Sequence, residues 1–362
     1  MTEDEASDAR GERLLDQVAE VAESVLWPAA QRVDQADAIP RGHFEALAGT
    51  GAFGLAAPRP LGGCGVGRVT AGAVFRRLGG ACGATAFSFA QHHGVVGALV
   101  TTPNEALRRR WLGPLCRGTL AGTAYAHVRR PGAGPLRATR RPGGWRFDGV
   151  APWVTSWGRA EVFSVAAVSA DGELVWALLP TDAGMVPSDP LDLVVFGATG
   201  SVRLELAGSD VADAAVLVVD DLARWRVGDR PMAARPNPMA LGIGDRAIAL
   251  VAATDPEVAA VLEVDQEDLA ARAERATGGI GTAVPEDGDA LVGTLAALRA
   301  EVVLAAQRLA AGAMAAAGGR GAELAHPAQR LGREALFYVI QAQSGEGRLA
   351  TLAAVADARG PG

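Results

Sequence analysis

Apolar residues recur at two different spacings along this chain, and the change of spacing divides it into three parts. Near the start they recur at helical spacing, as in Leu14, Val18 and Val21, which is typical of an amphipathic helix. The middle third instead carries short alternating runs separated by Gly and Asp, which is typical of β-strands. The helical spacing then returns. We therefore predict an N-terminal helical domain over 1–119, a middle antiparallel β domain over 120–230 and a C-terminal four-helix bundle over 231–362.

The individual elements follow from the same pattern. Strands are predicted in the middle of the chain at 163–168, 174–179, 202–206 and 215–219. Helices rich in Ala, Leu and Arg are predicted after them at 239–251, 258–275, 291–317 and 328–355. Apolar helices are also predicted at 69–78 and 85–100. This order of helices, strands and helices indicates an α+β fold.

Composition limits the classes of protein to consider. The 362 residues include 34 basic residues, all of them Arg, and 41 acidic residues, so the net charge of −7 argues against nonspecific binding to nucleic acid. Three widely spaced cysteines, Cys64, Cys82 and Cys116, fit neither a disulfide framework nor a zinc site. The acidic N-terminus is unlike a signal peptide, and no apolar run reaches membrane-spanning length. We therefore expect a cytoplasmic protein that binds neither membrane nor nucleic acid.

Candidate chemistry is concentrated in residues 121–163. A Gly-rich loop at 131–134 offers backbone N–H groups that a planar or anionic ligand can approach closely. After the next strand, Trp153 offers a flat indole and Thr155 offers a hydroxyl that can donate to a ring nitrogen. These parts suit the ring system of a flavin. The alternative is a β-meander with a Gly turn and a core Trp.

The order and spacing of several motifs resemble the acyl-CoA dehydrogenase family over most of the chain. Residues 129–135 resemble the family's Thr-Glu-Pro-Gly-Ala-Gly-Ser loop, and residues 149–156 resemble its Gly-x-Lys-x-Trp-Ile-Thr-Asn strand. Upstream, residues 51–63 match its Gly-x-x-Gly-Leu-x-x-Pro-x-x-x-Gly-Gly pattern, and residues 110–112 match its Arg-Trp-Leu step into the β domain. The resemblance implies the family's three-domain fold and a bound flavin, FAD with FMN as the alternative.

The resemblance also implies which residues hold the flavin. On the strand that leads into the Gly-rich loop and at the end of the following strand they are Ala126, His127, Val128, Arg129, Trp153, Val154 and Thr155. The family's loop Ser and the Asp after it are replaced here by Pro135 and Leu136. We find neither its Arg-x-x-Phe-Gly motif nor its Gln-x-x-Gly-Gly motif, which grip the adenosine pyrophosphate across the subunit interface. These losses leave FMN, or no flavin, open beside FAD.

The family's catalytic base has no direct counterpart. In family dehydrogenases a Glu before Gly-Thr removes the α-proton of an acyl thioester while the flavin accepts a hydride. That position falls here on Ala342, or on Gln341 if the match shifts by one, and neither side chain is a base at neutral pH. Glu346 is a candidate replacement, because on a continuous helix it lies one turn beyond Ala342. The alternative is a solvent-facing Glu paired with Arg348 or a neighbouring chain.

His92 is the second candidate catalytic residue. Ser88, His92 and His93 lie in the predicted helix at 85–100, which the resemblance places beside the flavin. Some oxygen-activating flavoproteins of this fold carry a His on this helix and lack the Glu. His92 shares a helical face with Ser88, and an imidazole can donate to a flavin peroxide or move a proton near neutral pH. The alternative is a packed histidine pair at a helix interface.

These observations favour a flavin-dependent oxidoreductase that acts on an acyl thioester or a related small molecule. One alternative is a flavin-dependent monooxygenase of the same fold, favoured by His92 and the absent Glu. The other is a non-catalytic subunit of a heteromeric acyl-CoA dehydrogenase, favoured by the lost pyrophosphate motifs. The resemblance implies an electron-transfer flavoprotein or a flavin reductase as redox partner. It also implies a homo-oligomer, or assembly with a paralogous subunit.

Overall fold

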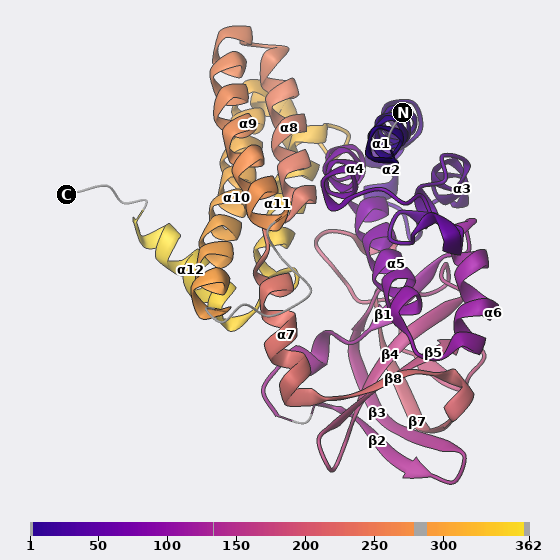
Figure 1. The fold of residues 1–362 in the computed structure, drawn as a ribbon. Coiled ribbons are helices and arrows are strands. Elements are labelled where there is room, and N and C mark those ends of the chain that lie inside the picture. The colour runs from indigo at the N-terminus through magenta and orange to yellow at the C-terminus, as the bar shows by residue number, and fades with distance from the viewer. Residues whose placement is uncertain (1–2, 133, 279–287, 358–362) are drawn as a thin grey trace.

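The computed structural model describes residues 3–132, 134–278 and 288–357. Figure 1 shows a twisted sheet with the N-terminal and C-terminal helices standing side by side above it. Helix α7 runs from the sheet up to the C-terminal helices. This arrangement confirms the predicted α+β fold, with N-terminal helices, a central sheet and C-terminal helices.

The N-terminal helices pack around α5. Most of α5 is buried, because its residues are apolar or small on every face, as in a helix at the centre of a core. It lies against strand β1 and neighbouring helices. A π-helical turn at Ala22–Leu26 joins the first two helices. The helices are α1 Glu3–Val21, α2 Trp27–Asp34, α3 Arg41–Gly49, α4 Arg68–Ala81, α5 Gly83–Thr101 and α6 Glu105–Cys116.

The strands form one mixed sheet in the order β6-β7-β3-β2-β4-β5-β8, with β1 beside β4. Most pairs are antiparallel as predicted, but β4 runs parallel to β1 and β2 because the chain crosses over the β2–β3 hairpin before it enters β4. Every residue of β4 is buried, so this strand reads as a continuous apolar run. The strands are β1 Ala121–Ala124, β2 Leu136–Arg141, β3 Gly144–Val154, β4 Val162–Ser169, β5 Glu173–Pro180, β6 Met185–Pro187, β7 Val202–Ala212 and β8 Val216–Asp221.

The C-terminal helices differ from the prediction at both ends. The predicted domain boundary at residue 230 falls inside α7, and the single helix predicted at 328–355 is two helices with a break between them. In the described part of the chain, no helix has both the length and the apolar character needed to cross a membrane. The helices are α7 Leu222–Ala234, α8 Pro238–Ala252, α9 Pro256–Gly278, α10 Gly288–Ala317, α11 Pro327–Ile340 and α12 Gly345–Asp357.

The two groups of helices meet closely where α4 crosses α8. A Cβ atom on Gly242 would lie 1.8 Å from the carbonyl oxygen of Arg76, so only glycine permits this approach. Arg76 then donates two hydrogen bonds to the carboxylate of Asp245, at 2.6 and 2.7 Å. The crossing therefore combines backbone contact with a bidentate ion pair.

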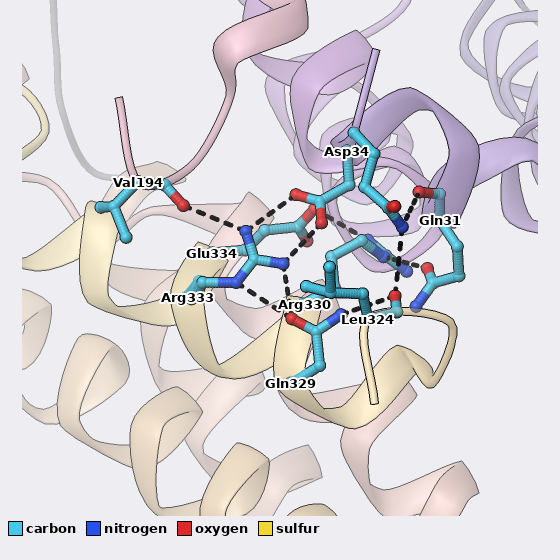
Figure 2. Close-up of polar contacts among 9 residues, drawn as sticks. Gln31, Asp34, Val194, Leu324, Gln329, Arg330, Arg333 and Glu334 are labelled. Atoms are coloured by element: carbon cyan, nitrogen blue, oxygen red, sulfur yellow. Dashed lines mark hydrogen bonds and ion pairs between the residues drawn. The ribbon is translucent and has the colours of Figure 1, made fainter. Parts of the chain in front are cut away.

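A second polar contact joins α11 to α2 and to the segment before β7, and Figure 2 shows it in close-up. We call it the domain junction; it comprises Gln31, Asp34, Arg330, Arg333 and Glu334. Arg330 is almost fully buried and donates to Glu334 at 2.8 Å and to Gln31 at 2.5 Å. Arg333 donates to both oxygens of Asp34, at 3.0 and 2.5 Å. Each guanidinium of the junction thus has a carboxylate partner.

Candidate functional site

The turn that follows β1 carries the first group of predicted flavin contacts. It is a 3-10 helix, Ala126–Arg129, that exposes Ala126 and buries His127 and Val128. The Nε2–H of His127 donates to the Ala166 carbonyl at 2.9 Å, and burial lowers the pKa of this imidazole. Val128 packs in a small apolar cluster under β4. Both buried residues therefore fix the turn to the sheet, and β3 packs against the same turn.

Arg129 leaves the turn toward α7. Its guanidinium donates to both carboxylate oxygens of Asp229, at 2.6 and 2.9 Å, and lies 5.1 Å from the centre of the Tyr125 ring. Burial alone would lower the pKa of Arg129, but Tyr125 and Asp229 together raise it above its ordinary value. Asp229 is consequently fully engaged by one arginine.

The Gly-rich loop is also held by α7, through a residue that the sequence did not single out. Arg226 donates to the carbonyl oxygens of Val128 at 2.8 Å and Gly132 at 2.7 Å, and to that of Arg130. Gly132 and Gly134 have the positive φ angles, 86° and 72°, that favour glycine; the predicted loop residue between them, Ala133, lies outside the described residues. Three carbonyls of this segment therefore point toward α7.

The end of β3 carries the second group of predicted flavin contacts, Trp153, Val154 and Thr155. Val154 is fully buried, and the buried Thr155 hydroxyl lies 3.2 Å from the Ser201 hydroxyl. Trp153 is half-buried and lines a hollow of about 570 Å³ together with Pro152, Arg203 and residues 188–193. We call this the Trp153 hollow. Its volume lies in the range of small-molecule sites in proteins.

The C-terminal helices contribute a third group, which the sequence did not predict. Arg299 of α10 donates to the Arg235 carbonyl at 3.1 Å and to the Gln341 carbonyl. Asn237 donates from Nδ2 to Oε1 of Gln341 at 3.0 Å. These contacts tie the start of α8 and the break between α11 and α12 to one buried guanidinium. Burial, followed by the charges of Arg129 and Arg235, lowers the pKa of Arg299 to about 10.

Comparison with known proteins relates part of this chain to a known family. Residues 9–119 match the acyl-CoA dehydrogenase N-terminal domain. Over 217 residues the chain is 27% identical to the probable acyl-CoA dehydrogenase YngJ of Bacillus subtilis (strain 168), and the matched stretch spans 56% of each chain. Residues 9–119 therefore carry the family's N-terminal domain, and together these matches support an acyl-CoA dehydrogenase family member.

Solved structures extend the likeness of fold to nearly the whole chain. A glutaryl-CoA dehydrogenase from Mycobacterium smegmatis in complex with FADH2 has a TM-score of 0.76 at 16% identity, covering 98% of this chain and 95% of its own. The dibenzothiophene monooxygenase TdsC of Paenibacillus sp. A11-2 has a TM-score of 0.78 at 18% identity, covering 96% and 98%. KijD3 in complex with FMN and a dTDP-linked sugar has a TM-score of 0.76 at 20% identity, covering 97% and 95%.

The family's catalytic Glu can be aligned with either Ala342 or Gln341. The backbone conformation at the break between α11 and α12 distinguishes these two alignments. Ala342 has φ = 51°, the left-handed conformation that favours glycine. A glycine follows the family's Glu, so this geometry favours the register that aligns Ala342 with that glycine and Gln341 with the Glu. In that register the Gln341 carboxamide would stand where the family's dehydrogenases have their base.

Glu346, the candidate replacement for the family's base, lies elsewhere. The prediction assumed a continuous helix through Ala342, but α11 ends at Ile340 and α12 begins at Gly345, so the assumed one-turn relation to Ala342 does not hold. Glu346 accepts a hydrogen bond from Arg230 of α7 at 2.9 Å. A backbone hydrogen bond in the first turn of α12 and this arginine lower the pKa of Glu346. Glu346 is thus engaged by an arginine of α7 and holds its charge more strongly than an ordinary carboxylate.

The histidines of α5 are buried beside aromatic rings, which matches the packed alternative. His92 donates from Nε2 to the Phe53 carbonyl at 3.1 Å and accepts at Nδ1 from the Ala121 N–H at 3.3 Å, so both nitrogens are used. Burial lowers its pKa to about 4. His93 differs, because neither of its ring nitrogens has a partner among the described residues, and the same holds for the Ser88 hydroxyl. Of the two, His93 is the histidine with hydrogen-bonding capacity left.

Proposed function

We propose that the protein is a flavin-dependent oxidoreductase that acts on an acyl thioester or a related small molecule. The observation that carries the proposal is Trp153, whose indole lines a hollow of about 570 Å³ at the end of β3. Structural relatives of this fold are described with FADH2 and with FMN. Their nearly complete coverage of the chain supports a site in the same place on the fold.

The described residues suit a flavin ring on this side. Trp153 would supply a flat apolar wall, and the Thr155 hydroxyl retains hydrogen-bonding capacity beyond its contact with Ser201. A bound flavin would supply two-electron transfer. FAD and FMN both remain candidates, because the adenosine-binding motifs are missing from the sequence while the ring-side residues are kept.

The reaction itself is constrained by Gln341. A carboxamide cannot remove an α-proton, and Asp229 is held by two hydrogen bonds to Arg129. Conventional α,β-dehydrogenation should therefore be slow. This observation favours a monooxygenase as second candidate, and one relative of the same fold is a dibenzothiophene monooxygenase. His93 would then be the residue of α5 with nitrogens available to a ligand.

The redox partner depends on whether the protein is a dehydrogenase or a monooxygenase. A dehydrogenase would pass electrons to an electron-transfer flavoprotein, and a monooxygenase would take reduced flavin from a flavin reductase. Assembly as a homo-oligomer, or with a paralogous subunit as in the non-catalytic alternative, is supported by exposed apolar residues on α11 and α12, namely Leu336, Ile340, Leu349, Leu352 and Val355. Light scattering at micromolar concentration tests the assembly, and a stable monomer would contradict it.

Flavin binding is tested first. The purified protein should show flavin absorbance after incubation with excess FAD or FMN, and Thr155→Val should weaken retention by roughly 1–3 kcal/mol, the cost of an unpaired buried group. Fluorescence titration with each flavin measures this. No binding of either flavin by the wild type would refute the proposal. Acyl-CoA turnover with an artificial acceptor, compared with oxygen-dependent turnover plus a flavin reductase, then separates the two reactions.

A further inference from the structure

Positive charge is in excess around the residues that tie the turn after β1 to the C-terminal helices. We call this group the arginine cluster; it comprises Arg129, Asp229, Arg235 and Arg299. Asp229 is its one carboxylate, and Arg129 occupies both of its oxygens. No ion pair joins Arg235 or Arg299 to any carboxylate of residues 9–132, 134–278 or 288–357. Among these residues, two guanidinium charges of the cluster thus have no carboxylate partner.

Arg299 cannot serve as the ligand-binding member. It is 5% exposed, and its terminal nitrogens donate to the carbonyls of Arg235 and Gln341. Its part is to hold those two backbone segments in place and to add a fixed positive charge beneath them. A buried cation without a counter-ion is costly, which makes an anion bound nearby favourable.

Arg235 differs from Arg299 in both exposure and hydrogen bonding. It is solvent-exposed and follows α7 in an extended conformation, with ψ = 147°, as expected before Pro236. Its guanidinium makes no hydrogen bond or ion pair with the part of the chain that the structure describes. Protein nonetheless surrounds it closely enough for burial to lower its pKa, and Tyr125, Arg129 and Asp229 lie near enough to act on its charge. A small molecule can therefore reach a guanidinium whose charge is poorly compensated by the residues that the structure describes.

We propose that Arg235 binds an oxyanion, a carboxylate or a phosphate, on the small molecule that enters this site. The guanidinium fork matches either group in bidentate geometry, and Arg299 supports it by fixing its backbone and adding charge. The inference rests on the proposed function in taking a small molecule to be bound here, and it adds the arginine cluster to the site that Trp153 lines. The oxyanion has two sources: the acyl part of a substrate, or the phosphate of the flavin.

Two matched pairs of probes separate these sources. Glutaryl-CoA and pentanoyl-CoA share the CoA moiety and the acyl length, and they differ in a terminal carboxylate. FMN and riboflavin share the ring and differ in a phosphate. Affinities are measured by calorimetry for the wild type, for Arg235→Gln and Arg235→Lys, and for Arg140→Gln, an exposed arginine paired with Asp213 on the far part of the sheet.

The wild type should prefer the anionic member of one pair by about tenfold or more, in keeping with a charge-assisted hydrogen bond. Arg235→Gln should abolish that preference, Arg235→Lys should keep part of it, and Arg140→Gln should leave it unchanged. If Arg235→Gln loses the preference for glutaryl-CoA over pentanoyl-CoA, the oxyanion belongs to the substrate. If it loses the preference for FMN over riboflavin, the oxyanion belongs to the cofactor. If the wild type has no preference in either pair, or Arg235→Gln keeps it, the inference is wrong.

A competition experiment on the wild type guards against a variant that fails to fold. Inorganic phosphate should weaken binding of the preferred anionic probe and leave binding of its neutral counterpart unchanged. Equal effects on both members of the pair would overturn the inference. Arg235-dependent binding of glutaryl-CoA by a protein that takes up neither FAD nor FMN would instead uphold it while refuting the proposed flavin function.

Discussion

The protein contains two groups of arginines, each built around a buried one, that differ in charge balance. In the domain junction, Arg330 and Arg333 face Glu334 and Asp34, so cations and carboxylates are matched (Figure 2). In the arginine cluster, Asp229 is the one carboxylate for three arginines, and it is paired with Arg129 alone. A matched group needs no ligand to balance its charge, and it holds elements together. An unmatched group keeps an electrostatic cost in the fold that an incoming anion can relieve.

The largest expected effect is at the junction. Arg330→Met leaves Glu334 buried without its partner. Burial raises the pKa of the Glu334 carboxyl, and the charge of Arg330 opposes that rise. Removing one partner of a buried pair typically costs about 3–5 kcal/mol. Urea denaturation measures the loss. Adding Glu334→Gln to the same variant should recover part of the loss. A loss below about 1 kcal/mol for Arg330→Met would show that the Arg330–Glu334 pair, which lies within α11, contributes little to stability.

The second effect supplies the carboxylate that the cluster lacks. Gln341→Glu places it beside Asn237 and Arg299, at the position of the family's base. Acyl-CoA turnover by flavin-loaded protein should rise by about 10²-fold, the lower end for a general base, because nearby arginines keep the new carboxylate ionised and weakly basic.

Ala342→Glu is the matched control for that experiment. It places the carboxylate in the other register, on a residue whose φ of 51° already disfavours a side chain. It should give little or no gain. A larger gain from Ala342→Glu than from Gln341→Glu would mean that the register inferred from the backbone is the wrong one.

The sequence predicted the fold much better than the site. Residue spacing located most helices and strands, because apolar periodicity is a local signal. The break after Ile340 was missed because Gln341 and Ala342 are ordinary helix residues, and only the backbone shows the left-handed turn that separates Glu346 from Ala342. Arg226 and Asp229 act on a loop about 100 residues earlier in the chain, and no local pattern reveals such a pairing. The packing of His92 likewise depends on Phe53 and Ala121, far from it in sequence.

The third prediction concerns His92, which becomes a buried cation without a counter-ion when acid protonates it. The pKa of His92 is lowered from 6.5 to about 4 by burial, so the stability linked to its neutral form is present above pH 6.5 and is lost as the pH falls toward 4, at roughly 1.4 kcal/mol per pH unit. His92→Phe keeps a ring in place but cannot take up the proton. The difference in unfolding free energy between wild type and variant should therefore narrow as the pH falls to about 5. A difference that is constant with pH would show that His92 does not carry this linkage.

The smallest expected loss of stability comes from a substitution in the arginine cluster that matches Arg330→Met in the domain junction. It directly tests whether charge balance distinguishes the two groups. Arg299→Met applies the Arg330→Met substitution to the arginine cluster. It removes hydrogen bonds to two carbonyls, but it strands no carboxylate and relieves a buried charge whose pKa burial has lowered to about 10. These effects oppose each other, so the loss should be about 1 kcal/mol or less, several-fold below that at the junction. Phosphate should also stabilise the wild type more than the variant, measured by urea denaturation with sulfate-free buffers at constant ionic strength. If Arg299→Met costs as much as Arg330→Met, and phosphate stabilises both proteins equally, charge balance does not distinguish the two groups.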